Sequence, residues 1–260
     1  FPGYADPSAT IVIDGKVTAF VEEERLVRNK HATAYFPMRS INYVLEASGL
    51  SIQDVDVITV GWDCEAHDSG ALAKHFEAIN RQYPPTSHDA SYQASRISKL
   101  GAATHRQRLY RSLRRAFGEA QLPPIEFVDH HLSHAVMAYH CSGFPDSLVL
   151  TIDGSGEWAT TCWWRGAEGA LERLHQVDTP HSLGWFYSAF TEYLGFEAYD
   201  GEYKVMGLAA YGKSNPEIEA KLEKMIWYDG AGGFSSDPYK LSMGPRGFSD
   251  YYPDTLIEHM

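Results

Sequence analysis

The chain has 260 residues, of which 44% are hydrophobic and 22% are charged, and its formal net charge is −12. This composition is ordinary for a globular protein with one large domain or two subdomains. The acidic balance argues against a general nucleic-acid binder, because such proteins present basic surfaces. No apolar run approaches the roughly 20 residues that span a bilayer, so we expect neither nucleic acid nor a membrane as a partner.

Cysteine usage bears on the cellular compartment. Cys64, Cys141 and Cys162 lie far apart and form neither a CxxC pair nor a disulfide framework. Together with the lack of a signal-peptide pattern, this favours a reducing, cytoplasmic setting. Because the chain starts at Phe1 and an element pattern is unfinished at Met260, we expect residues 1–260 to belong to a longer protein.

The first half of the chain alternates strands and helices. The expected strands are 9–13, 17–21, 55–61 and 125–128. The expected helices are 37–48, 71–82, 92–118 and 130–140. Asp14-Gly15 predicts a hairpin turn, Gly49 a helix stop, and Gly101 an interruption of the long helix.

A second strand-rich series follows Phe144-Pro145. Its expected strands are 148–152, 160–164 and 171–177, and its expected helices are 183–194, 203–211 and 216–228. Residues 230–253 are expected to form a loop. A strand-rich α/β unit repeated twice is typical of the actin-like, sugar-kinase and Hsp70 (ASKHA) fold. We therefore expect subdomains at 1–145 and 146–260, the second without its closing strands and helices.

A possible metal site follows from two histidines and an aspartate. His130 and His134 are four residues apart, so on a helix they share one face. Asp153 ends an apolar, β-rich run. Two imidazoles and one carboxylate can bind a divalent transition metal and leave positions open for substrate. His131 points to another face and is expected to be structural, and metal binding should weaken as the pH falls through about 6.5.

The residues after Asp153 allow two interpretations. Gly154, Ser155 and Gly156 form either an ordinary hairpin turn or a loop whose N–H groups bind the phosphate of a cofactor. Glu157 either coordinates the metal through water or caps the turn. Our candidate cofactor-binding residues include all four.

Basic residues are the other candidates for binding an anion. Lys204 lies at an expected helix start between Gly201 and Gly207, which favours a phosphate contact there and close packing at Gly207. A second group follows three glutamates and is either a solvated connection or a cluster facing an anionic ligand: Arg25, Arg28, Lys30 and His31. A third favours a solvated helix face over a docking surface for another domain: Arg108, Arg111 and Arg115.

Four segments occur together in an order that resembles a known family. They are VEEERLVRNKH at 21–31, DHHLSHA at 129–135, DGSGE at 153–157, and the stretch from HSLG at 181–184 to GEYKVMGLAAYG at 201–212. This set resembles the nodulation-protein-U type O-carbamoyltransferases, which modify antibiotics and nodulation factors.

The resemblance implies an ATP-dependent O-carbamoyltransferase. Carbamoyl phosphate and ATP give a carbamoyl-adenylate, whose carbamoyl group passes to a hydroxyl of a small-molecule natural product. The family metal ligands correspond to His130, His134 and Asp153, with Fe²⁺ the expected metal and a further aspartate ligand beyond Met260. The resemblance also implies a C-terminal adenylate-forming domain outside residues 1–260, in the same chain or in another.

The general base is where the sequence departs from the family pattern. Relatives usually carry a histidine directly before the early aspartate, whereas Ala5 precedes Asp6 here. We therefore take His31 as the substitute base and Lys204 as the second catalytic candidate. Two other functions remain open: a small-molecule kinase of the same architecture, which has no need of an HxxxH pair, and a non-catalytic remnant of the transfer domain.

Overall fold

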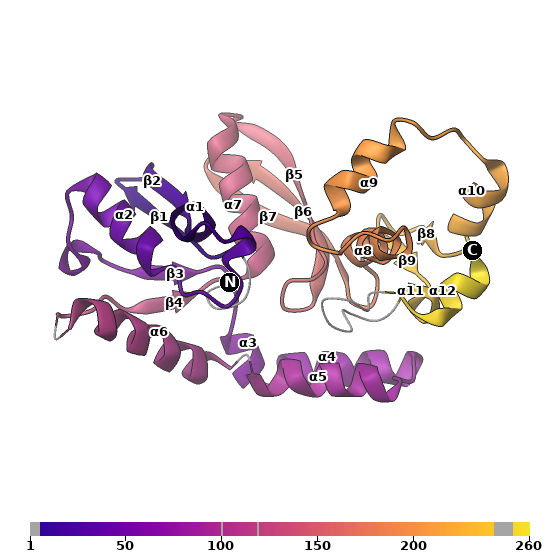
Figure 1. Cartoon of the computed structure of the whole chain (residues 1–260), viewed down its shortest axis with the longest axis horizontal. Helices are drawn as coiled ribbons and strands as arrows, with labels where there is room; N and C mark the ends of the chain where they lie inside the picture. Colours follow the sequence, from indigo (N-terminus) through magenta and orange to yellow (C-terminus); the bar gives the residue numbers. More distant parts are fainter. Residues whose placement is uncertain (1–5, 100, 119, 242–251) are drawn as a thin grey trace. The chain divides into compact units, whose positions relative to one another are not determined.

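The computed structural model describes residues 6–99, 101–118, 120–241 and 252–260. In this part of the chain the protein is mixed α/β, with three two-stranded sheets and one three-stranded sheet (Figure 1). The chain divides into two compact units, residues 1–68 with 100–128, and residues 69–99 with 129–260. None of the helices in the described ranges has the length and apolar character that a membrane span requires.

The first unit contains two small sheets and the helices that cover them. Its elements are β1 (Ser8–Ile13), β2 (Lys16–Glu22), α1 (Glu23–Val27), η1 (Lys30–Ala32), α2 (Met38–Ser48), η2 (Ile52–Asp54), β3 (Ile58–Val60), α3 (Glu65–Asp68), α6 (Ala102–Phe117) and β4 (Ile125–Phe127). Strands β1 and β2 are antiparallel, and β3 and β4 are parallel.

Local signals explain the hairpin and helix ends of this unit. Asp14 and Gly15 both have positive φ, 49° and 74°, as the tight turn between β1 and β2 requires. Gly49 ends α2 in the left-handed conformation with φ 68°. On α6, Leu109 and Leu113 are buried in a core with β3 and β4. The expected solvated arginines of α6 are exposed: Arg108, Arg111 and Arg115.

The second unit is built around the three-stranded sheet. Its elements are α4 (Ala71–Gln82), α5 (Ser87–Lys99), α7 (His130–Ser142), β5 (Asp146–Ile152), β6 (Ala159–Ala167), β7 (Ala170–Asp178), α8 (Leu183–Tyr193), α9 (Glu202–Ala209), α10 (Pro216–Leu222), β8 (Ile226–Tyr228), β9 (Phe234–Ser236), α11 (Pro238–Leu241) and α12 (Asp254–His259). Strands β5, β6 and β7 are antiparallel neighbours in that order.

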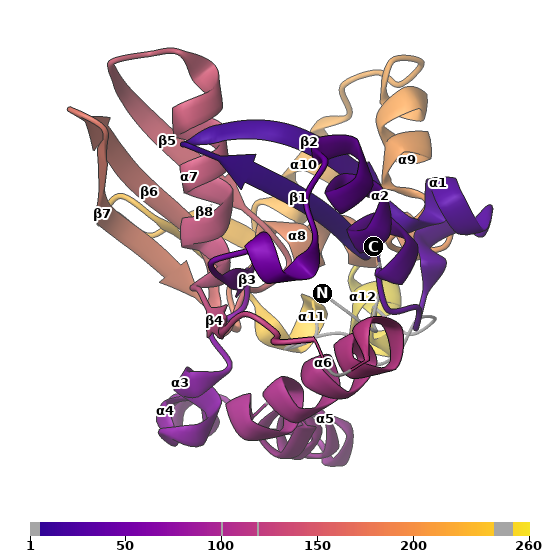
Figure 2. The same ribbon diagram turned by 90° about the vertical axis from the view of Figure 1, so that its left-hand side faces the viewer.

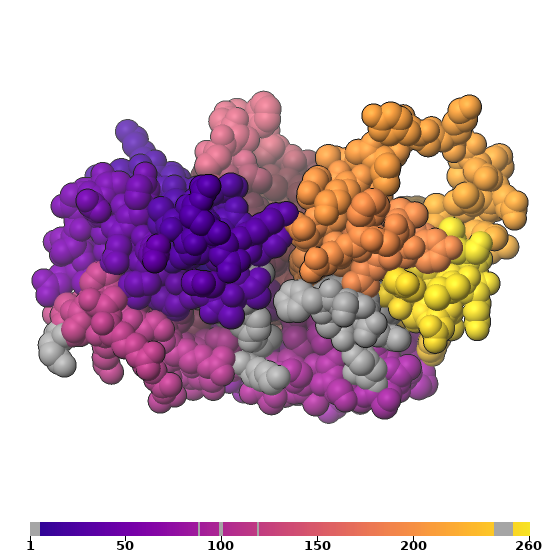
Figure 3. Space-filling view, in the orientation of Figure 1, coloured from indigo at the N-terminus to yellow at the C-terminus, as the bar shows by residue number. Residues whose placement is uncertain are grey.

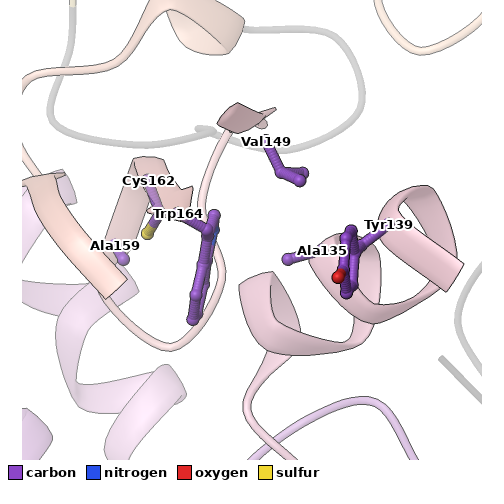
Figure 4. Packing of buried hydrophobic residues seen from close by; sticks show 6 residues of the cluster. All are labelled: Ala135, Tyr139, Val149, Ala159, Cys162 and Trp164. Atoms are coloured by element: carbon purple, nitrogen blue, oxygen red, sulfur yellow. The ribbon is translucent and has the colours of Figure 1, made fainter. Parts of the chain in front are cut away.

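Helix α7 packs against one face of this sheet, as the two ribbon views show (Figures 1 and 2). The alternation along β5 places Val149 and Thr151 on the covered face and leaves Leu148, Leu150 and Ile152 exposed. Between helix and sheet lies an apolar cluster that includes Tyr139, Val149 and Trp164 (Figure 4). This cluster holds the histidine-bearing helix beside the end of β5.

Three expected elements differ from the structure. The expected strand 55–61 is reduced to β3, Ile58–Val60. The expected helix 216–228 is wrong in its second half: α10 ends at Leu222, and the β-prone residues 226–228 pair with β9 instead. The expected loop 230–253 contains β9 and α11, and its residues 242–251 lie outside the described residues. The division into subdomains at residue 145 stays a prediction.

Candidate metal centre

The first turn of α7 carries the two histidines. Asp129 is its N-cap, and its carboxylate accepts a hydrogen bond from Leu132 N at 2.7 Å. The other carboxylate oxygen of Asp129 pairs with Arg173 at 2.8 Å, and the guanidinium of Arg173 lies 4.4 Å from the centre of the Trp164 ring. With the helix start fixed in this way, the rings of His130 and His134 project from successive turns, with their Nε2 atoms 3.2 Å apart.

Asp153 reaches the same point from the end of β5. Its N–H donates to Thr160 O at 2.8 Å and so continues the β5–β6 ladder by one residue. Its Oδ2 lies 2.7 Å from His130 Nε2 and 3.5 Å from His134 Nε2. The three candidate ligand atoms therefore all lie within 4.8 Å of one another. The structure brings together the three residues that the sequence analysis named as metal ligands.

The donor set fits a transition metal. Ligand atoms about 2.1 Å from a tetrahedral metal lie about 3.4 Å apart, and two of the three observed separations, 3.2 and 3.5 Å, are close to that spacing. The third is the 2.7 Å hydrogen bond between His130 and Asp153. The side chains of His130, Asp153 and His134 are 19%, 40% and 56% exposed, so a substrate can approach from the His134 side.

The carboxyl group of Asp153 is ready to bind a cation. Burial raises its pKa, but hydrogen bonds from His130, His134 and the Gly154 N–H outweigh burial and hold the pKa below the usual range. Asp153 is therefore ionised near neutral pH, which is the form that binds a metal.

His131 has a different, structural environment. It is fully buried, its Nε2–H donates to Ala159 O at 2.9 Å, and its Nδ1 accepts from the Thr151 hydroxyl at 2.8 Å. Burial lowers its pKa, so the ring stays neutral. This agrees with the structural role that the sequence analysis expected, because both nitrogens are used in tying α7 to the hairpin.

The segment from Asp153 to Trp158 connects β5 to β6. Neither Asp153 nor Gly154 has the positive φ that a two-residue Asp-Gly turn needs, so the connection is a longer loop. A Cβ on Gly154 would lie 3.0 Å from the Trp185 ring, and one on Gly156 would lie 3.1 Å from His130 Cβ. Both glycines are thus required by close packing beside the cluster, and Ser155 lies half-buried between them.

Two contacts of this loop were missed in the sequence. Arg96 of α5 donates to the carbonyl oxygens of Gly156 and Glu157 at 3.0 and 3.3 Å. The carboxylate of Glu157 accepts from the main-chain N–H of His130. Both contacts join residues that are distant in the sequence, and no local pattern indicates them.

Gly184, in the HSLG segment, presses against the same loop. A Cβ at this position would lie 2.4 Å from Gly154 N and 2.5 Å from the carbonyl carbon of Asp153, where the backbone cannot yield cheaply. We therefore expect Gly184→Ala to lower the free energy of unfolding by about 3 kcal/mol, as measured by denaturant unfolding.

The matched control is Gly207→Ala. Gly207 also lies in a helix, but no atom lies within 4 Å of an added Cβ. Alanine there should leave stability unchanged or raise it by up to about 1 kcal/mol. Equal destabilisation by the two substitutions would show that the contact of Gly184 with the loop is not the cause.

Lys204 lies on α9, away from the histidine–aspartate cluster in its contacts. Its Nζ is 3.9 Å from Asp200 Oδ2 and lies over the rings of Phe196 and Tyr203. No residue of α9 is buried, and the orange residues from α9 to α10 enclose an open gap in Figure 3. The family segment that contains Lys204 and Gly207 is thus on an exposed helix, and its expected phosphate contact stays a prediction.

His31 belongs to the first unit. Its Nδ1 lies 2.9 Å from Asp6 Oδ1, and its main-chain N–H donates to Glu24 Oε2 at 2.8 Å. The backbone at His31 is left-handed, with φ 60°, an uncommon conformation for a residue other than glycine. The partner of His31 found here is therefore Asp6 rather than the neighbouring basic residues.

The three consecutive glutamates before His31 have separate roles. Glu23 is buried and accepts hydrogen bonds from the main-chain N–H groups of Arg39 and Ser40, and so caps α2. Glu22 and Glu24 both pair with Arg25. The segment is therefore partly structural, which neither of the two interpretations of its basic residues included.

Comparison with known proteins agrees with this geometry. The family model described as carbamoyltransferase N-terminus matches residues 3–243. The protein sll1178 of Synechocystis is 38% identical over 215 residues, which are 81% of this chain and 34% of that protein. The nodulation protein NolNO of Sinorhizobium fredii is 36% identical over 211 residues, which are 81% of this chain and 28% of that protein.

A shorter match is with the nodulation protein NolO of Bradyrhizobium diazoefficiens, 44% identical over 85 residues, or 33% of this chain and 15% of that protein. The chain thus spans about a third of the length of the first two relatives. The family model, in contrast, covers the chain almost from end to end. The chain therefore belongs to the family of carbamoyltransferase N-terminal domains.

Proposed function

We propose that this chain carries out the transfer step of an ATP-dependent O-carbamoyltransferase. The observation that carries the proposal is the convergence of His130, His134 and Asp153 at one point in a member of this family. The donor would be a carbamoyl-adenylate made from carbamoyl phosphate and ATP, and the acceptor a hydroxyl of a small-molecule natural product.

In the proposed reaction the acceptor oxygen forms a bond to the carbamoyl carbon. The bond from that carbon to the adenylate phosphate oxygen breaks, AMP leaves, and the hydroxyl proton passes to a base. A divalent metal held by His130, His134 and Asp153, with Fe²⁺ as the proposed ion, would supply Lewis-acid polarisation. His31 is the proposed base, supported by its pairing with Asp6, since a carboxylate at Nδ1 orients an imidazole for proton transfer at Nε2.

The phosphate of the adenylate needs hydrogen-bond donors. We propose that main-chain N–H groups of the loop Gly154, Ser155 and Gly156 and the ammonium group of Lys204 supply them, with Gly207 leaving room beside the nucleotide. The absence of a Cβ contact at Gly207 supports that last assignment. In a protein of net charge −12, a local donor site is needed to hold an anionic ligand.

We also propose that the chain contributes to a duplicated actin-like fold. Two antiparallel ribbons support this idea: β1–β2, which α2 contacts, and β5–β6–β7, which α8 follows. The adenylate-forming activity is proposed to lie in the part of the relatives that this chain does not match.

The products formed from ATP test the proposed function. The intact protein is incubated with ATP, carbamoyl phosphate labelled in its carbamoyl carbon, and a panel of polyhydroxylated natural products. We expect label to move to an acceptor with one AMP released for each carbamoyl group transferred. Release of ADP with a phosphorylated acceptor would instead identify the small-molecule kinase.

A further inference from the structure

Glu157 is a buried carboxylate directly beside the metal centre. It is 5% exposed, and its two oxygens lie 3.3 and 3.4 Å from the main-chain nitrogen of His130. This N–H is the first of α7 and has no partner within its own helix. A carboxylate is favoured at such a helix start because the N–H groups there carry partial positive charge.

The loop that carries Glu157 is held from its other side by Arg96. The guanidinium of Arg96 donates to the carbonyl oxygens of Gly156 and Glu157 at 3.0 and 3.3 Å, and to the Tyr92 hydroxyl at 3.1 Å. The main chain at 156–157 is therefore fixed when the Glu157 side chain reaches α7.

His130 is thereby held to one short loop at two points. Its ring bonds Asp153 Oδ2 at 2.7 Å, and its main-chain N–H bonds the Glu157 carboxylate. Asp153 and Glu157 are four residues apart in the same β5–β6 connection. The spacing between the ligand atoms of α7 and that of β5 thus depends on the Glu157 contact.

We propose that Glu157 is a positioning residue, which holds the first turn of α7 at the correct distance from Asp153 for both to bind one metal ion. The inference rests on the metal centre of the proposed function. It assigns the Glu157 carboxylate to the helix and not to a phosphate, because an ionised carboxylate repels a phosphate at close range. The hydrogen bond, rather than the negative charge, is the essential part.

Two substitutions separate the hydrogen bond from the charge. Glu157→Gln keeps a side-chain oxygen that accepts from His130 N, whereas Glu157→Ala removes the acceptor. The control is Glu172→Ala, which removes an exposed carboxylate from β7 of the same sheet. Co²⁺ binding to the intact metal-free protein is measured by competition with a chromophoric chelator, and hydrogen exchange is followed in the peptide that covers residues 129–136.

We expect Glu157→Ala to weaken Co²⁺ binding by about 10- to 100-fold, the usual effect of losing a residue that orients a metal ligand. It should also speed exchange in the first turn of α7, whereas Glu157→Gln should stay within about tenfold of wild type in affinity. Glu172→Ala should change neither measurement.

Two outcomes would overturn the inference. One is wild-type Co²⁺ affinity in Glu157→Ala, and the other is an equal loss in the alanine and glutamine variants, which would make the charge essential. Failure of the proposed function looks different, because the wild-type protein would then bind no Co²⁺. In that case faster exchange in Glu157→Ala would still report the helix contact, but a role in metal positioning would be excluded.

Discussion

Replacing His134 with alanine is expected to remove most of the bound transition metal. Three ligand atoms converge on the site, and His134 supplies one of them. Loss of a ligand itself should cost more than the about 10- to 100-fold that follows loss of an outer contact. The fold should survive, because the His134 side chain is 56% exposed. Elemental analysis of the purified intact protein and Co²⁺ titration measure the effect.

The matched control for this experiment is His140→Ala. His140 is an exposed histidine on the same helix, in its last turn. Its removal changes the histidine count and helix composition equally, yet leaves the cluster complete. Metal content that is the same in His134→Ala, His140→Ala and wild type would rule out the proposed centre.

Signals contained within a few residues were reliable guides to the fold. Asp14-Gly15 forms the expected turn, α4 covers the expected residues 71–82, and the long helix is interrupted near Gly101 as expected. At Gly101 a Cβ would lie 2.3 Å from Asp68 Oδ1, so tertiary packing also requires the glycine. Expectations were wrong where a pairing partner lay further along the chain, as for residues 226–228, which pair with β9.

The candidate site shows the same division. The spacing of His130 and His134 is a local property of a helix, so the sequence was enough to place both rings on one face. The hydrogen bonds of Glu157 to His130 and of Arg96 to the loop join residues 27 and 60 or more positions apart. Such contacts depend on how α5, α7 and the β5–β6 hairpin pack, which no short pattern specifies.

Asp153→Asn is the substitution expected to have the largest effect on activity. Asparagine has nearly the same shape as aspartate, so its side chain can still contact the Gly154 N–H and the His130 ring, which lie 2.7 Å from the two carboxylate oxygens. It has no negative charge, however, and is a poor ligand for a transition metal beside two imidazoles. The change therefore removes the proposed metal with little disturbance of the hairpin.

We expect carbamoyl transfer by this variant to fall by at least roughly 100-fold, the scale on which enzymes lose turnover when one electrostatic stabiliser of the transition state is removed. Transfer is measured as AMP release that depends on the acceptor. Thermal unfolding of the variant serves as the control for structure, and it should match that of the wild type apart from any stabilisation by the metal.

The informative comparison is with adenylate formation in the same intact protein, followed as carbamoyl-phosphate-dependent release of pyrophosphate from ATP. If the transfer step resides in this chain and adenylate formation resides elsewhere, Asp153→Asn should abolish the first and leave the second near its wild-type rate. An interaction made only in the transition state lowers turnover more than substrate binding, so the loss should lie in kcat rather than in KM. A parallel fall in both half-reactions, or none in either, would contradict this division of labour, because Asp153 would then serve a shared structure or no step at all.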